Sequence, residues 1–70
     1  MSFYEFLQSF VGDDTPLGKL VDYVEQDVNF SKEETVPEHI LEYFNEQPLV
    51  KEQYIETVKR SLSVFQDLFQ

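Results

Sequence analysis

Residues 49–69 read LVKEQYIETVKRSLSVFQDLF, an uninterrupted stretch without glycine or proline that carries the strongest structural signal in the chain. At 100° per residue its large apolar side chains fall on one arc of about 140°, and most of its charged side chains fall opposite. The pattern therefore predicts an amphipathic helix over about residues 49–69, the longest helix of the protein. The apolar arc comprises Val50, Tyr54, Ile55, Val58, Leu62, Phe65, Leu68 and Phe69.

The segment before this stretch predicts a shorter helix over residues 37–46. Thr35 is placed as its N-cap, and Glu38 lies three residues later, where it completes a capping box. Pro48 ends the helix because the residue before a proline is pushed away from helical angles. The apolar face of this helix comprises Ile40, Leu41 and Phe44.

The N-terminal part of the chain predicts a helix over residues 2–10. Ser2 and Glu5 have the spacing of a capping box, and Gly12 ends the helix. Its apolar residues recur at the positions i, i+3, i+4 and i+7, which form one helical face. These residues are Phe3, Phe6, Leu7 and Phe10.

A further helix is announced by Thr15, which is a good N-cap, and by Pro16 at the first helical position. Phe30 follows this helix in a connection and is expected to fill the core from there. Ser31 and Glu34 are placed to cap one short extra turn. The apolar stripe of the helix comprises Leu17, Leu20, Val21, Val24 and Val28.

No segment alternates apolar and polar residues over the length of a strand, so the sequence predicts an all-α fold. We expect a compact bundle of four main helices, with one short extra turn, in a single domain over residues 1–70. Hydrophobic residues make up 41% of the chain and aromatic residues 16%, which supplies a core for so short a protein. Cysteine is absent, so the fold must be stabilised by packing alone.

The charge of the chain is strongly negative: 14 acidic residues against 5 basic ones give a formal net charge of −9. This field opposes binding to phosphate backbones and to anionic membrane surfaces. The chain also lacks an apolar run of about 18 residues and a basic leader region, so a cytoplasmic location is expected. Repulsion among the carboxylates predicts raised pKa values and a stability that rises on moderate acidification.

The sequence predicts no catalytic, cofactor-binding or metal-ligating residue. His39, the only histidine, points away from the apolar face of its helix and has no cysteine or second histidine to share a metal or a nucleophile. Glu38, Glu42 and Glu46 recur every four residues and are interpreted as a solvated face. Neither glycine lies in a lysine-containing phosphate loop. We therefore expect a protein that is not an enzyme and has no cofactor.

Five residues form a candidate partner surface. Tyr4, Tyr23 and Tyr43 each lie at the edge of an apolar stripe, Leu49 stands outside the core at the start of the last predicted helix, and Val64 lies outside the apolar arc. Two interpretations stay open at this point. In the first, the tyrosines are boundary residues with buried rings and solvent-exposed hydroxyl groups. In the second, they mark an interface with a partner, where tyrosine is enriched. The wide apolar arc of the last helix reflects burial between two neighbours or a partner surface.

Several motifs resemble one known family. SFYEFL at residues 2–7, DTPLG at residues 14–18 and FSK at residues 30–32, together with Asp27 and Tyr43, appear in the order and spacing of the YozE-like family of small proteins from low-GC Gram-positive bacteria. The resemblance spans nearly the whole chain. It implies a sterile-alpha-motif-like fold, in which short helices pack on a long final helix.

Folds of this kind mostly mediate protein association, and a few bind RNA. The YozE-like family offers no catalytic residues that the resemblance could transfer to this chain. The chain departs from the family at Ser31, where proline is common, and in lacking the tryptophan that many members have near the C-terminus. These differences concern the connection around Ser31 and the packing of the last helix.

The leading functional hypothesis is a protein–protein interaction module that associates with itself or with another, unidentified protein. One alternative is nucleic-acid binding through the basic pair Lys59 and Arg60, which the net charge makes unfavourable. Another is an acidic mimic of nucleic acid that binds a basic protein. No membrane partner is expected.

Overall fold

The protein consists of helices joined by short connections. A computed structural model describes the backbone of residues 1–69 and the side chains of residues 1–68, and this part of the chain contains no strand. The predicted all-α class is confirmed, and the last helix is the longest. The helices are α1 Phe3–Leu7, the short 3₁₀ helix η1 Gln8–Phe10, α2 Pro16–Gln26, α3 Pro37–Asn45, α4 Pro48–Gln53 and α5 Ile55–Phe69.

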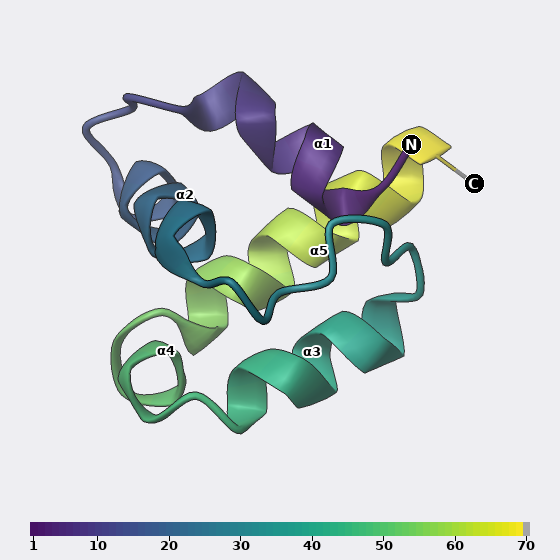
Figure 1. Ribbon diagram of the computed structural model, residues 1–70. Helices are drawn as coiled ribbons and strands as arrows, with labels where there is room; N and C mark the ends of the chain where they lie inside the picture. Colours follow the sequence, from purple (N-terminus) through teal and green to yellow (C-terminus); the bar gives the residue numbers. More distant parts are fainter. Residues whose placement is uncertain (70) are drawn as a thin grey trace.

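Helix α5 lies in the middle of the arrangement (Figure 1). α1 and α2 lie on one side of it and α3 lies on the other, while α4 joins α3 to α5 at one end. The N-terminus lies near the last turns of α5, where the ring centroids of Phe3 and Phe65 are 5.5 Å apart. The final helix is therefore the element on which the other helices pack.

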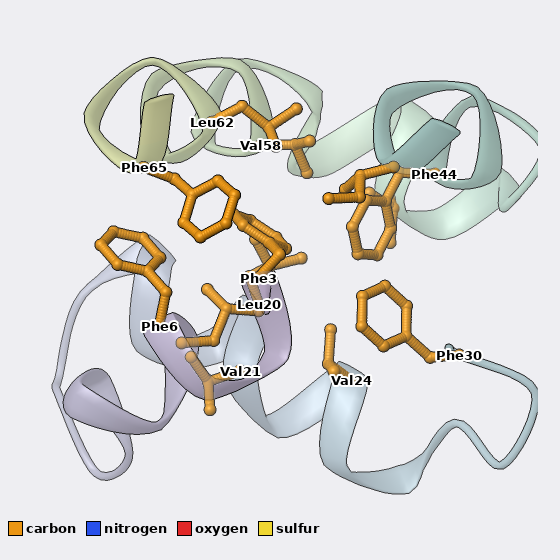
Figure 2. Close-up of a cluster of buried hydrophobic side chains, with 13 residues drawn as sticks. Phe3, Phe6, Leu20, Val21, Val24, Phe30, Phe44, Val58, Leu62 and Phe65 are labelled. Atoms are coloured by element: carbon orange, nitrogen blue, oxygen red, sulfur yellow. The ribbon is translucent and has the colours of Figure 1, made fainter. Parts of the chain in front are cut away.

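The core is one continuous cluster to which α1, α2, α3, α4 and α5 all contribute. Figure 2 shows Phe3 and Phe6 facing Phe65 at one end, and Phe30 facing Phe44 at the other. Phe30 is only 6% exposed, so the prediction that it fills the core from a connection is confirmed. The buried hydrophobic residues are Phe3, Phe6, Leu7, Leu20, Val21, Val24, Phe30, Ile40, Phe44, Val50, Val58, Leu62 and Phe65.

The prediction of one helix over residues 49–69 is wrong, because the chain bends at Tyr54. Its backbone angles, φ −127° and ψ 4°, leave the helical range and separate α4 from α5. A straight helix of this length would measure roughly 31 Å. The whole molecule extends only 29 Å along its longest axis. The bend turns α4 across the end of the bundle, where Val50 becomes fully buried.

Two apolar residues assigned to helix stripes lie outside the core. Val28 is 95% exposed, because α2 already ends at Gln26 and Asp27 takes an extended conformation. Leu68 is 61% exposed, in the last turn of α5. The side chain of Phe69, also assigned to the apolar arc, lies outside the described residues. Fewer apolar residues of these two stripes therefore pack into the core than the periodicity predicts.

The helix caps follow the sequence in two cases and differ in a third. Ser2 and Glu5 form the predicted capping box, and the Thr15 hydroxyl accepts the backbone N–H of Gly18 at 3.2 Å. The predicted capping box of Thr35 with Glu38 is wrong, because the N-cap of α3 is the next residue, Val36, which has no capping side chain.

Glu34 supplies the polar contacts that precede α3. Its carboxylate accepts the backbone N–H groups of Thr35 and Val36, each at 3.1 Å. The short extra turn predicted at Ser31 and Glu34 is present as a backbone turn, in which the N–H of Glu34 donates to the carbonyl of Ser31 at 3.4 Å. One carboxylate thus orders the chain that leads into the helix.

Candidate functional site

The three tyrosines of the predicted partner surface use their hydroxyls within the chain. Tyr4 donates to both carboxylate oxygens of Glu25, at 3.2 and 3.1 Å, which ties α1 to α2. Tyr23 donates to the side-chain oxygen of Gln47 at 3.1 Å. Each ring is half-buried against the core. These contacts show that the three tyrosines are boundary residues between helices. Whether the tyrosines also take part in an interface with a partner stays a prediction.

Tyr43 makes a part-buried contact between two helices. It sits on α3, and its hydroxyl donates to the carboxylate of Asp27 at the end of α2. Burial raises the pKa of Tyr43, and the hydrogen bond and negative charge of Asp27 raise that pKa further. The hydroxyl therefore keeps its proton, and its donor role, at any physiological pH.

His39 lies on the surface of the fold. The side chain is 63% exposed, as predicted, and its Nδ1 atom lies 3.3 Å from a carboxylate oxygen of Glu34. Glu38, Glu42 and Glu46 are exposed. Among the described residues no group of three or more histidine, cysteine, aspartate or glutamate side chains is placed to hold a metal ion. In the same part of the chain, no helix combines the length and the apolar character that crossing a membrane requires.

Two carboxyl groups have pKa values that differ from the sequence-based expectation. The hydrogen bond with the backbone N–H of Ser2 holds the pKa of Glu5 below its ordinary value. The backbone N–H of Val36 does the same for Glu34, with help from Thr35 and His39. Mutual repulsion is expected to raise the pKa values of many carboxyl groups, and Glu5 and Glu34 are exceptions, because local hydrogen bonds to the ionised form outweigh distant charges.

The most distinctive surface feature is a groove between α5 and the N-terminal helices, which we call the α5 groove. It encloses about 430 Å³. Its wall on α5 consists of positions i, i+3, i+4 and i+7, which form one helical face. These residues are Thr57, Arg60, Ser61 and Val64, and the facing wall consists of Phe6, Phe10, Thr15, Pro16 and Leu17.

The wall opposite α5 is shaped by the turn between η1 and α2. Gly12 has φ +85°, a left-handed conformation that favours glycine, and the backbone N–H of Asp13 donates to the carbonyl of Phe10 at 3.1 Å. A Cβ atom on Gly18 would lie 1.9 Å from the carbonyl oxygen of Asp13, so only glycine allows the turn to approach α2 this closely. Two glycines thus fix the position of Phe10 relative to α5.

The α5 groove is lined mostly by apolar surface, and two of its three hydroxyl groups, those of Ser61 and Thr15, take part in hydrogen bonds within the chain. Ser61 donates to the carbonyl of Val58 at 2.9 Å, and Thr15 accepts from the N–H of Gly18. The rings of Phe6 and Phe10 meet edge to face, with centroids 5.4 Å apart. The groove therefore presents aromatic and aliphatic surface with few free polar groups.

Among the described residues that line the α5 groove, Arg60 is the only charged one. It is exposed and makes no hydrogen bond or ion pair among the described residues. Its neighbour Lys59 lies 4.0 Å from a carboxylate oxygen of Glu56 and does not line the groove. In a chain of net charge −9, the groove is thus an apolar surface edged by an unpaired cation.

Of the five predicted surface residues, only Val64 lines the α5 groove, at whose edge it is 49% exposed. Leu49, on α4, is exposed as predicted, at 45%, but is not part of the groove. Sequence reasoning assigned Phe10 and Leu17 to the core and missed their role as groove walls. The available signal was their position on either side of the Gly12 turn, where a helix end leaves part of a large side chain uncovered.

Comparison with known proteins identifies one family. A family model described as the YozE SAM-like fold matches residues 2–67, a range that includes α1 to α4 and most of α5. A comparison with curated proteins finds no match, and neither does a comparison with solved structures. The matched range contains all nine residues that line the α5 groove. The chain belongs to the YozE family of SAM-like folds.

Proposed function

We propose that the protein is a non-enzymatic interaction module that binds a partner protein through the α5 groove. The observation that carries this proposal is an open, mostly apolar groove beside Val64 and Arg60, where Phe10 and Leu17 pack against the core and leave part of their side chains uncovered. An apolar surface left uncovered in a folded domain costs free energy, and such surfaces frequently mark binding sites. A partner that covers the groove removes this apolar surface from water, which favours binding.

The chemistry of the groove supports a binding role and gives no support to catalysis. No histidine or carboxylate lines it, and the Ser61 hydroxyl donates to a backbone carbonyl. A nucleophile needs a base within hydrogen-bond reach, which this arrangement does not supply. We also propose that the module acts in the cytoplasm, which suits a small acidic chain without cysteine.

Nucleic-acid binding is the weaker candidate. Lys59 faces Glu56, so the basic pair that suggested this function contributes one unpaired cation, Arg60, in place of a basic patch. Neutralising several phosphates requires several such groups, and the net charge of −9 opposes the approach of any polyanion. An acidic mimic of nucleic acid would use the charged surface and leave the groove without a role.

The substitution Val64→Glu tests the proposal, because it places a charge inside the apolar groove at a position that is half exposed and tolerates it in the fold. Affinity capture from a bacterial lysate, followed by titration of each recovered protein, should show binding at least about tenfold weaker for V64E than for wild type. Sedimentation over a concentration series tests the case in which the partner is a second copy.

The matched control is Val28→Glu, which adds the same charge at an apolar residue that is 95% exposed and lies far from the groove lining in sequence. V28E should retain wild-type binding and a wild-type melting temperature. Equal binding by V64E and wild type, or equal loss in V64E and V28E, would rule out the groove as the partner site.

A further inference from the structure

We infer that the α5 groove takes an amphipathic α-helix of the partner, with two apolar side chains one turn apart and a carboxylate that pairs with Arg60. This inference rests on the proposed function and specifies the chemistry of the partner. It follows from the length of the groove, its openness and its charge.

The length of the groove sets the number of apolar anchors. On α5 its wall runs from Thr57 to Val64, seven residue steps. At 1.5 Å per residue this is about 10 Å, or two helical turns. Apolar side chains at positions i and i+4 of a partner helix lie about 6 Å apart along its axis, so both fit between the ends of the groove, whereas a third at i+8 would lie about 12 Å from the first and extend past the end. Phe10 and Leu17 face these anchors from the opposite wall.

The openness of the groove favours a helix over a small molecule. Arg60, Val64, Thr15 and Pro16 are all exposed, and of the nine lining residues only Phe6 and Ser61 are buried. Sites for small molecules usually enclose roughly 70–90% of the ligand surface. A ligand in this groove would keep one side in water, whereas a helix places its own backbone and polar face over that side.

The charge at the rim selects a carboxylate at one position of the partner helix. Arg60 has no partner among the described residues, and the groove lining contains no acidic residue that would compete for it. A guanidinium group binds a carboxylate through two parallel hydrogen bonds, and a lysine on the partner would be repelled. Because the chain as a whole carries a charge of −9, this preference applies to one residue of the partner and not to an acidic segment.

The test uses synthetic peptides as probes of known chemistry. The first is a short alanine-based helical peptide with two leucines four residues apart and one glutamate beside that pair. Two otherwise identical peptides, called its twins, carry glutamine or lysine in place of the glutamate. Binding is followed by NMR titration of the isotope-labelled protein. We expect shifts at Phe10, Leu17 and Val64. The glutamate peptide should bind about two- to five-fold more tightly than the glutamine twin, and the lysine twin should bind most weakly.

Substitutions of Arg60 provide the decisive comparison. R60Q should abolish the difference between the glutamate and glutamine peptides, and R60E should make the lysine twin the tightest ligand. K59Q is the matched control, since Lys59 is the adjacent cation and does not line the groove; it should leave the wild-type order intact. A reversed order in R60E supports the inference, because a structural role of Arg60 would weaken all three peptides equally.

Two outcomes overturn the inference and leave the proposed function standing. If the three peptides shift the groove resonances with equal affinity, the inferred pairing of a partner carboxylate with Arg60 is wrong. If the fatty acid decanoate shifts the groove resonances and none of the peptides does, the ligand of the groove is a small amphipathic acid and not a helix. If peptide shifts fall outside the groove and V64E also retains the captured partner, both the inference and the proposed function are wrong.

Discussion

At the scale of single residues, polar side chains at the edge of the core decide how the helices are held together. Tyr43 joins α3 to the end of α2 through Asp27, while Tyr4 joins α1 to α2 through Glu25. The periodicity of the sequence places these tyrosines at the edges of the stripes. It does not reveal their acceptors, because Tyr43 and Asp27 are sixteen residues apart and meet only when the helices pack.

Removing the Tyr43 hydroxyl should therefore destabilise the fold. In Y43F the half-buried Asp27 carboxylate loses a donor, at a cost of about 1–2 kcal/mol. For a chain of this size the melting temperature should fall by about 7–14 °C, as measured by circular dichroism.

The control for that measurement is Y54F. Tyr54 is also a half-buried tyrosine packed on the core, but its hydroxyl makes no hydrogen bond among the described residues. Y54F should stay within about 0.5 kcal/mol of wild type. If Y43F were as stable as Y54F, the contact with Asp27 would carry no stabilising energy.

At the scale of helices, the sequence predicted the existence of the elements more accurately than their boundaries. The Ser2 and Thr15 caps are readable because donor and acceptor are three residues apart. The bend at Tyr54 cannot be read from the sequence in this way, because it depends on how far α4 must turn for Val50 to reach the core. The same holds for the N-terminus of α3, where Glu34 provides contacts that the predicted capping box would have provided.

The capping carboxylates also set the response of the fold to acid. The pKa values of Glu5 and Glu34 lie below the ordinary value of 4.5 in the folded protein. Their stabilising contribution is therefore complete above pH 4.5 and is lost as the pH falls through the folded values. The urea midpoint should decrease below about pH 4.5. The double variant E5Q/E34Q should be less stable than wild type at neutral pH, and this difference should shrink in acid.

E42Q serves as the control in this titration, since it removes a carboxylate from the exposed face of α3 that makes no hydrogen bond among the described residues. It should keep the wild-type midpoint at neutral pH. A stability that rises steadily from neutral pH to pH 3 would show instead that repulsion among the carboxylates outweighs the capping contacts.

At the scale of the whole molecule, one core built from every α-helix leaves an open groove between α5 and the N-terminal turn. The fold class, the core residues Phe3, Leu20, Phe44 and Phe65, and the family were all accessible from the sequence. The α5 groove was not. Its walls come from segments at least forty residues apart, and Phe10 and Leu17 have the periodicity of core residues. Only the packed structure shows which apolar side chains remain uncovered.

If the α5 groove is the partner site, a bound partner must leave its footprint on the residues that line the groove. In a complex of the methyl-labelled chain with an unlabelled captured partner, NMR cross-saturation measures which methyl groups touch that partner. We expect strong saturation at Leu17 and Val64, and none at Val28 or Leu49. Saturation confined to Leu49 or Val28, with Leu17 and Val64 untouched, would contradict it.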